Sequence, residues 1–280
     1  MSCCRYGEMF RKIREQKGFS LSHFETLNIS KSSIAKFERG ETLMAFERVY
    51  SMLQMMNVSL SEYELSVNHY CQSYQEFFLV ELERAEVLGD NIKLEKLYQE
   101  SLYSGCKWLI VLAKSKLGVL NKQEKREAIN FILSVKLWGY FELALTHSVL
   151  DLLTTVELKS LFNVWKNMNK NYFRILKYRR RVFQCAYKAV IILSSRGEKD
   201  IVEEILAITD DNHGEELDFF VKVIRQLSIG FTIYSFDSKI KGELIMNKNL
   251  ILLEELGNKD LRNYYEKKLK IYKRIRSCVI

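Results

Sequence analysis

The chain contains no proline and only 12 glycines among its 280 residues. Average protein composition, with about 5% proline and about 7% glycine, would place roughly 14 and roughly 20 of them in a chain of this length. Folds rich in strands need these residues in their many turns, whereas helix interiors disfavour both. Because 48% of the residues are hydrophobic, the chain can bury a full core. These features predict an all-α fold with room for one small and one larger domain.

Hydrophobic residues recur with the helical period of 3.6 along the chain, separated by short breaks of Gly, Asn, Ser or Asp. The first expected helices are short and lie at residues 4–16, 20–27, 31–39, 45–56 and 60–67. The later helices are mostly longer and lie at residues 70–88, 92–116, 122–137, 140–152, 155–168, 171–194, 198–209, 215–234, 238–256 and 259–276. This change in helix length predicts two domains, residues 1–66 and residues 70–280.

The connections between the later helices are short, so consecutive helices must pack as antiparallel neighbours. The simplest arrangement of this kind is a TPR-like right-handed α-solenoid of helical hairpins. No clean repeat consensus is visible in the sequence, so any repeats are degenerate. A closed helical bundle is the structural alternative.

The formal net charge of +8 does not by itself indicate nucleic-acid binding. Residues 1–66 carry nine basic and eight acidic side chains, so nearly all of the excess lies in the rest of the chain. An argument for DNA binding must therefore depend on the geometry of a motif.

Several classes of protein are disfavoured by what the sequence lacks. The six cysteines form no CxxC pair and have no histidine at a zinc-type spacing, so no metal site is expected. No phosphate-binding glycine loop and no pattern of nucleophile, base and acid is present, so we expect no cofactor and no enzyme. No hydrophobic run approaches the roughly 20 residues of a membrane span. We expect a cytoplasmic protein with reduced cysteines and no membrane partner.

Residues 20–43, SLSHFETLNISKSSIAKFERGETL, contain a helix, a tight turn at Asn28-Ile29-Ser30 and a second helix. The exposed face of the second helix is expected to carry Lys31, Ser32, Ser33 and Lys36, with no acidic residue among them. These side chains can all hydrogen-bond base edges or phosphates. Hydrophobic residues here and in the flanking helices have the spacing of one small shared core: Tyr6, Phe10, Ile13, Leu21, Phe24, Leu27, Ile29, Ile34, Phe37, Val49, Leu53 and Met56.

This segment resembles the lambda-repressor-like (XRE or Cro/CI type) helix-turn-helix, and the stretch SKSSIAKFERGE is similar to the Rgg/GadR/MutR family of regulators. The resemblance implies that the helix at 31–39 enters the DNA major groove. It assigns base contacts to Lys31, Ser32 and Ser33 and a phosphate contact to Lys36. It adds backbone contacts from Arg39, Arg11 and Lys12, and a structural ion pair between Arg14 and Glu38. Family members often begin the preceding helix with a glutamine that contacts phosphate, whereas this chain has Ser22 and His23 there.

A single domain of about 60 residues buries a modest DNA interface, so we expect a homodimer that reads an inverted-repeat operator in double-stranded DNA. The alternative from another class is a helical protein-interaction adaptor, whose helix-turn-helix contacts protein instead of DNA.

The resemblance also implies that the long domain binds a short linear signalling peptide. Asn163, Asn167 and Asn171 recur at i, i+4 and i+8, so they would form one stripe if the helix that starts at 155 continues. An amide donates and accepts hydrogen bonds, so such a stripe could hold the main chain of an extended peptide. A basic side chain from the cluster between Arg174 and Arg181 could hold its terminal carboxylate. The competing interpretation of the asparagines is a polar helix end followed by a loop.

Overall fold

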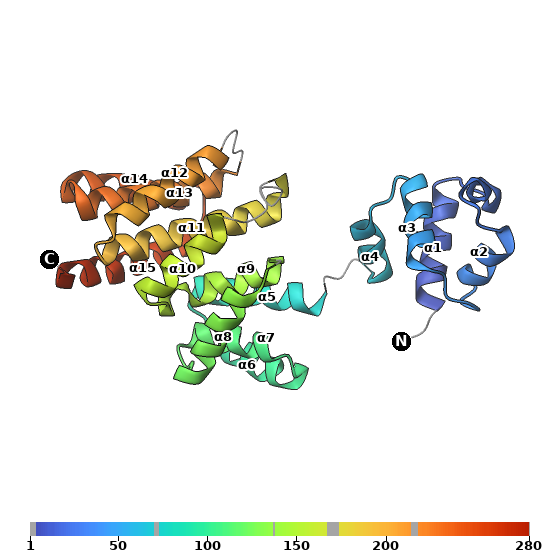
Figure 1. Cartoon of the computed structure of the whole chain (residues 1–280), viewed down its shortest axis with the longest axis horizontal. Helices are drawn as coiled ribbons and strands as arrows, with labels where there is room; N and C mark the ends of the chain where they lie inside the picture. The colour runs from blue at the N-terminus through green and yellow to red at the C-terminus, as the bar shows by residue number, and fades with distance from the viewer. Residues whose placement is uncertain (1–3, 70–72, 137, 167–173, 214–217, 280) are drawn as a thin grey trace. The chain divides into compact units, whose positions relative to one another are not determined.

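The computed structural model describes residues 4–69, 73–136, 138–166, 174–213 and 218–279. Every regular element in these ranges is helical, which confirms the all-α prediction (Figure 1). The chain separates into two compact units, residues 1–77 and residues 78–280, called here the N-terminal and C-terminal units. None of the described helices is long and apolar enough to cross a membrane.

The N-terminal unit begins with five short helical elements around one core. They are α1 (Cys4–Gln16), the 3₁₀ helix η1 (Leu21–Leu27), α2 (Lys31–Glu38), α3 (Phe46–Met55) and α4 (Leu60–Val67). Polar side chains define their starts, since the Ser30 hydroxyl accepts from the Ser33 amide and Ser59 forms a reciprocal capping box with Glu62. Phe10, Phe24, Ile34, Met52 and Leu53 are completely buried in the core.

The prediction that Tyr6 lies in this core is wrong, because its side chain is 48% exposed. The face of α1 that packs on α2 instead carries Gly7 and Phe10. A Cβ atom on Gly7 would lie 1.8 Å from the carbonyl oxygen of Phe37, so only glycine allows the two helices to approach this closely. Tyr6 contributes through its backbone, where its carbonyl accepts a hydrogen bond from the Tyr63 hydroxyl at 2.7 Å.

The C-terminal unit consists of mostly longer helices and one 3₁₀ turn. They are α5 (Tyr74–Leu88), which begins just before the unit boundary, α6 (Asn91–Ser104), α7 (Lys107–Leu117), α8 (Lys122–Ser134), α9 (Tyr140–Val149), η2 (Leu150–Leu152), α10 (Thr155–Lys166), α11 (Leu176–Ser195), α12 (Lys199–His213), α13 (Phe219–Phe236), α14 (Lys239–Glu255) and α15 (Lys259–Val279). Consecutive helices pair as hairpins, as α6 with α7 and α13 with α14 do (Figure 1).

One predicted helix, at residues 92–116, is in fact the α6/α7 hairpin. Gly105 ends α6 in the left-handed conformation with φ of +65°, which reverses the chain within two residues. The 20-residue helix α11 contacts α9, α12, α13 and α15. Residues 181–187 of α11 are all buried, so this helix organises the core of the unit and positions the side chains described below.

Candidate DNA interface and ligand groove

The turn between η1 and α2 has the geometry of a helix-turn-helix. Asn28 ends η1 in the left-handed conformation, with φ of 57°, and Ile29 buries its side chain in the core. Ser30 then begins α2 in extended backbone. The buried Ile34 and Phe37 fix the rotation of α2 about its axis, which leaves its opposite face in solvent.

The exposed face of α2 carries the residues to which the sequence assigns DNA contacts. Lys31, Ser32 and Lys36 are exposed, whereas Ser33 is half-buried. The Ser33 hydroxyl lies 2.8 Å from the Ser30 hydroxyl, so in this state it serves the start of the helix. The acidic residue of α2, Glu38, is buried on the other face. The face that would meet DNA therefore presents lysine and hydroxyl groups.

Four of the predicted DNA-contacting cations form exposed ion pairs with nearby acids. The N···O distances are 3.5 Å for Lys31 with Glu25, 2.5 Å for Arg39 with Glu41, 2.8 Å for Arg11 with Glu15 and 2.9 Å for Lys12 with Glu8. The hydrogen bond from Arg39 lowers the pKa of Glu41, and the charge of Lys36 adds to that effect. Exposed pairs of this kind contribute little to stability, so a DNA phosphate can replace the acid.

Two polar residues stand where many family members have a phosphate-binding glutamine. The ring nitrogen Nδ1 of His23 accepts the backbone N–H of Ser20 at 2.9 Å, which caps the start of η1. The hydroxyls of Ser22 and Ser20 lie 2.7 Å apart. Both side chains are exposed, but each is hydrogen-bonded to Ser20. Neither therefore replaces the phosphate contact of the glutamine in this structure.

Arg14 and Glu38, the pair predicted from the sequence, are joined beneath this surface. The guanidinium makes two hydrogen bonds to the carboxylate and a third, of 2.8 Å, to the carbonyl oxygen of Phe19. The hydrogen bond to Glu38 raises the pKa of Arg14 despite burial of the guanidinium. This pair fixes the C-terminal end of α2 to α1, and therefore the angle at which α2 is presented.

The C-terminal unit contains an open groove with a volume of about 810 Å³. Its lining comes from α5, α9, α11, α13, α14, α15 and the residues next to them. The lining includes apolar side chains such as Val80, Phe220 and Leu253 and basic ones such as Arg84 and Lys177. Its volume lies in the usual range of ligand sites, and its lining combines apolar walls with about as many polar and charged groups.

Two arginines of α11 in the groove are held by internal carboxylates. Arg181 donates to both oxygens of Glu83, at 2.6 and 3.3 Å, and to the Tyr140 hydroxyl at 3.1 Å. Arg180 pairs with Asp218 at 2.5 Å, and Asp218 caps the start of α13. The sequence predicts that a basic group of this cluster binds a peptide carboxylate. In the structure these two guanidinium groups already have carboxylate partners within the chain.

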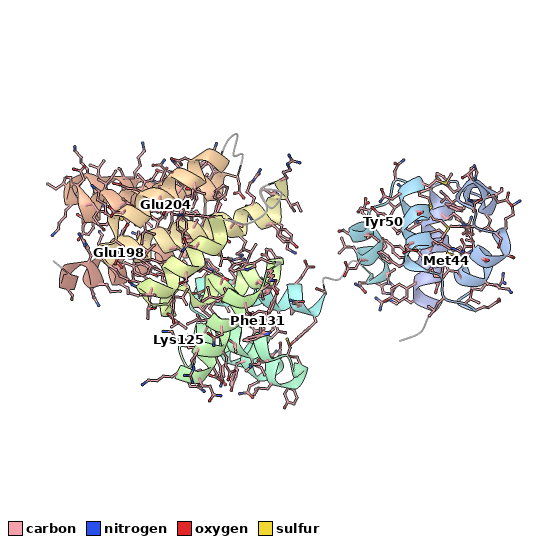
Figure 2. All side chains as sticks on the ribbon, viewed as in Figure 1. Met44, Tyr50, Lys125, Phe131, Glu198 and Glu204 are labelled. Atoms are coloured by element: carbon pink, nitrogen blue, oxygen red, sulfur yellow. The ribbon has the colours of Figure 1, made fainter. Side chains whose placement is uncertain are left out.

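The other predicted peptide-binding residues lie away from this lining. Asn163 is exposed on α10, Arg174 is exposed just before α11, and Asn167 and Asn171 fall outside the described residues. Lys159 and Lys166, which share the Asn163 face of α10, form ion pairs with Glu198 and Glu204 at α12. These two glutamates are labelled in Figure 2. Neither Asn163 nor Arg174 is among the residues that line the groove.

Sequence reasoning did not identify Glu83, Gln184 and Phe220 as groove residues. They belong to three different helices, and none stands in a recognisable motif. One sequence feature pointed to them, the basic cluster that ends at Arg181. A buried arginine requires a carboxylate partner from elsewhere in the chain, and here that partner is Glu83.

Comparison with solved structures shows the same fold in proteins of low sequence identity. The pheromone receptor Rgg2 of Streptococcus dysgalactiae, described as an SHP pheromone receptor, superposes with a TM-score of 0.75 at 20% identity, over 95% of this chain and 99% of that one. A candidate transcriptional regulator from Listeria monocytogenes EGD-e gives 0.78 at 14% identity, over 96% and 97%. PrgX in its complex with cCF10 gives 0.66 at 10% identity, over 98% and 93%.

Comparison with protein families covers both units of the chain. Residues 10–63 match the helix-turn-helix family. Residues 66–267 match the family described as the C-terminal domain of the HTH-type transcriptional regulator Rgg, which spans well over half of the chain. The chain therefore belongs to the Rgg family of HTH-type transcriptional regulators.

Proposed function

We propose that this Rgg-family regulator binds a specific DNA sequence through α2 and that a short linear peptide, bound in the groove of the C-terminal unit, controls its action. Two of the similar structures support the second part by their descriptions, since Rgg2 is described as a pheromone receptor and PrgX was solved with cCF10. The groove itself is the observation that carries the proposal to this chain.

On the DNA side, Lys31, Ser32 and Ser33 are assigned to base edges, and Ser33 would exchange its bond to Ser30 for this contact. Lys36, Arg39, Arg11 and Lys12 are assigned to phosphates. We infer a homodimer on an inverted repeat, because one such unit contacts too few base pairs to select a site in a genome.

Residues 1–66 then form the DNA-binding domain and residues 70–280 the regulatory and dimerisation domain. Because the target is chromosomal DNA, we place the protein in the cytoplasm and assign it no catalytic role.

On the peptide side, the groove offers apolar walls for hydrophobic side chains and the Gln184 amide for a main-chain contact. The stripe of Asn163, Asn167 and Asn171, with Arg174, remains a competing location. The groove and the asparagine stripe predict that different variants lose peptide binding.

Fluorescence polarisation with a panel of short apolar peptides encoded beside the gene tests the proposal. We expect at least one peptide to bind the full chain, with loss of affinity in Gln184→Ala and little change in Asn163→Ala. The opposite pattern would assign binding to the asparagine stripe. Absence of binding by every peptide would remove the peptide-controlled function.

A further inference from the structure

Beside the groove lies a cluster of charged side chains, called here the lysine cluster. It consists of Lys116, Lys188, Lys268, Glu86 and Asp151. Lys116 Nζ lies 2.5 Å from Glu86, and Lys188 Nζ lies 2.6 Å from Asp151 Oδ2. Lys268 Nζ lies between the two acids, 3.6 Å from Glu86 and 3.8 Å from the same Oδ2 of Asp151. These side chains come from α5, α7, η2, α11 and α15, and their exposed fractions range from 6% for Lys116 to 30% for Asp151.

The tyrosines and the histidine beside the lysine cluster are neutral, whereas the charge of Arg196 also acts on Asp151 and Tyr272. Burial raises the pKa values of Tyr264 and Tyr272 well above 10, and their hydroxyls hydrogen-bond Glu86 and Asp151. Burial, with the charge of Lys188 next, lowers the pKa of His147 well below its ordinary value.

The two acids, in contrast, are ionised. Burial opposes their charge, but Lys116, Lys188 and Lys268 together lower the pKa of Glu86 to about 2. Lys188 and Lys268 likewise lower the pKa of Asp151. The nearby Arg181 is already balanced by Glu83. Three lysines therefore face two carboxylates, and one positive charge has no counterpart within the cluster.

A cavity of about 60 Å³ borders the lysine cluster, several times the volume that one water molecule requires. Lys188, Lys268, Tyr264 and Tyr272 contribute to its wall. Glu83, Gln184 and Phe220 line both this cavity and the open groove, so the two adjoin each other. The Gln184 side chain, only 8% exposed, has an Oε1 atom without a hydrogen-bond partner. A buried polar atom without a partner is costly, and here it stands at the junction of the groove and the cavity.

We propose that this cavity binds a carboxylate between Lys188 and Lys268, and that the carboxylate is the C-terminus of the linear peptide whose preceding residues occupy the groove. The inference rests on the proposed peptide-binding function and specifies the orientation of the peptide. An uncompensated, partly buried cation is destabilising, and an entering carboxylate supplies the missing negative charge. It also receives charge-assisted hydrogen bonds from the two lysines, while the Gln184 amide meets the adjoining main chain.

A cluster that only joined helices would have a different charge balance. Removal of any lysine from a balanced cluster leaves a buried carboxylate unpaired and destabilises the fold. In the lysine cluster, removal of Lys268 leaves two lysines and two carboxylates, each already in a pair of 2.6 Å or less. The carboxylate-site proposal therefore predicts that Lys268→Met leaves the melting temperature of the unliganded chain unchanged or raises it.

The test uses the full chain and three pools of N-acetylated apolar octapeptides: free C-terminal acids, the same sequences as C-terminal amides, and amides with one internal Asp or Glu. Affinity selection with mass spectrometry measures binding to the parent chain, to Lys268→Met, to Lys188→Gln and to Lys268→Arg. The matched control is Lys270→Met, also on α15, whose side chain is 67% exposed. Melting temperatures of all variants without peptide are recorded.

We expect the free acids to bind the parent chain at least about tenfold more tightly than the amides, which is the scale of a hydrogen bond to a charged group. Lys268→Met and Lys188→Gln should lose this preference, while Lys268→Arg and Lys270→Met keep it. A preference for the internal-acid amides over the free acids would overturn the assignment to the C-terminus. Equal binding of acids and amides would overturn the carboxylate site while peptide binding stands. Binding of no pool would overturn the peptide function together with this inference.

Discussion

Arg14 and Glu38 lie 24 residues apart in the sequence and are joined by two hydrogen bonds, from Nε to Oε1 at 2.6 Å and from Nη2 to Oε2 at 2.9 Å. Their side chains are 9% and 5% exposed. A buried pair of this geometry is costly to break, because the remaining partner keeps its charge away from water. It links the helix that is assigned to the DNA groove with the first helix of the unit.

We predict that Glu38→Ala destabilises the N-terminal unit by about 3 kcal/mol, because the buried Arg14 then keeps only the half-exposed Glu15, at 3.4 Å, as a counter-ion. Hydrogen exchange of the full chain, followed in peptides from α1 and α2, measures this loss locally. Glu8→Ala is the matched control, since Glu8 forms an exposed pair with Lys12. Similar exchange in the two variants would contradict a stabilising role for the buried pair.

A second prediction concerns Glu25, which pairs with Lys31 at 3.5 Å on the proposed DNA surface. Glu25→Gln should increase DNA affinity, because it frees Lys31 and removes a negative charge that repels phosphate. The increase should be largest at low salt and shrink as salt rises. The control is Lys17→Ala, a change of charge at a residue that is not assigned to DNA. The charge of Lys17 acts on Glu62, at the start of α4. Unchanged or weaker operator binding by Glu25→Gln at low salt would place Lys31 away from the DNA.

Acid stability provides a third prediction. The lysine cluster holds the pKa of Glu86 at about 2 and that of Asp151 below its ordinary value of 3.8. A carboxylate with a lowered folded-state pKa contributes stability that is fully present above its unfolded pKa and is lost as the pH falls toward the folded value. The melting temperature of the C-terminal unit should therefore fall between pH of about 5 and about 2.

The variant that tests this cause is Glu86→Gln. Its melting temperature should be lower at neutral pH and should change less as the pH falls. Glu95→Gln, exposed on α6, should follow the parent curve. Parallel curves for all three proteins would show that the acid dependence arises elsewhere.

The helix-turn-helix could be predicted from sequence because its determinants are local. Ser30 begins α2 and Asn28 ends η1, and the period of Phe24, Ile34 and Phe37 sets the buried faces. The wrong prediction for Tyr6 has a different cause. Helical periodicity cannot show that α1 approaches α2 so closely that only Gly7 fits between them.

The groove could not be predicted in the same way, because its determinants are distant in sequence. Arg181 and its partner Glu83 are separated by 98 residues. The basic run of α11 looks continuous in the sequence, yet Arg174 and Arg180 are exposed and Arg181 is buried. Which arginine is available to a ligand depends on the carboxylates that neighbouring helices bring to it. Tertiary packing, and not helix propensity, decides that question.

The claim that α2 reads a DNA sequence is tested most directly by a footprint on the duplex that flanks the coding region. The full chain is compared with the Lys31→Ala, Lys36→Ala double variant at moderate salt. The expected result is two protected half-sites with centres about one helical turn apart, both lost in the double variant. Binding no tighter than to a random duplex, or full protection by the double variant, would contradict the assignment of α2 to the major groove.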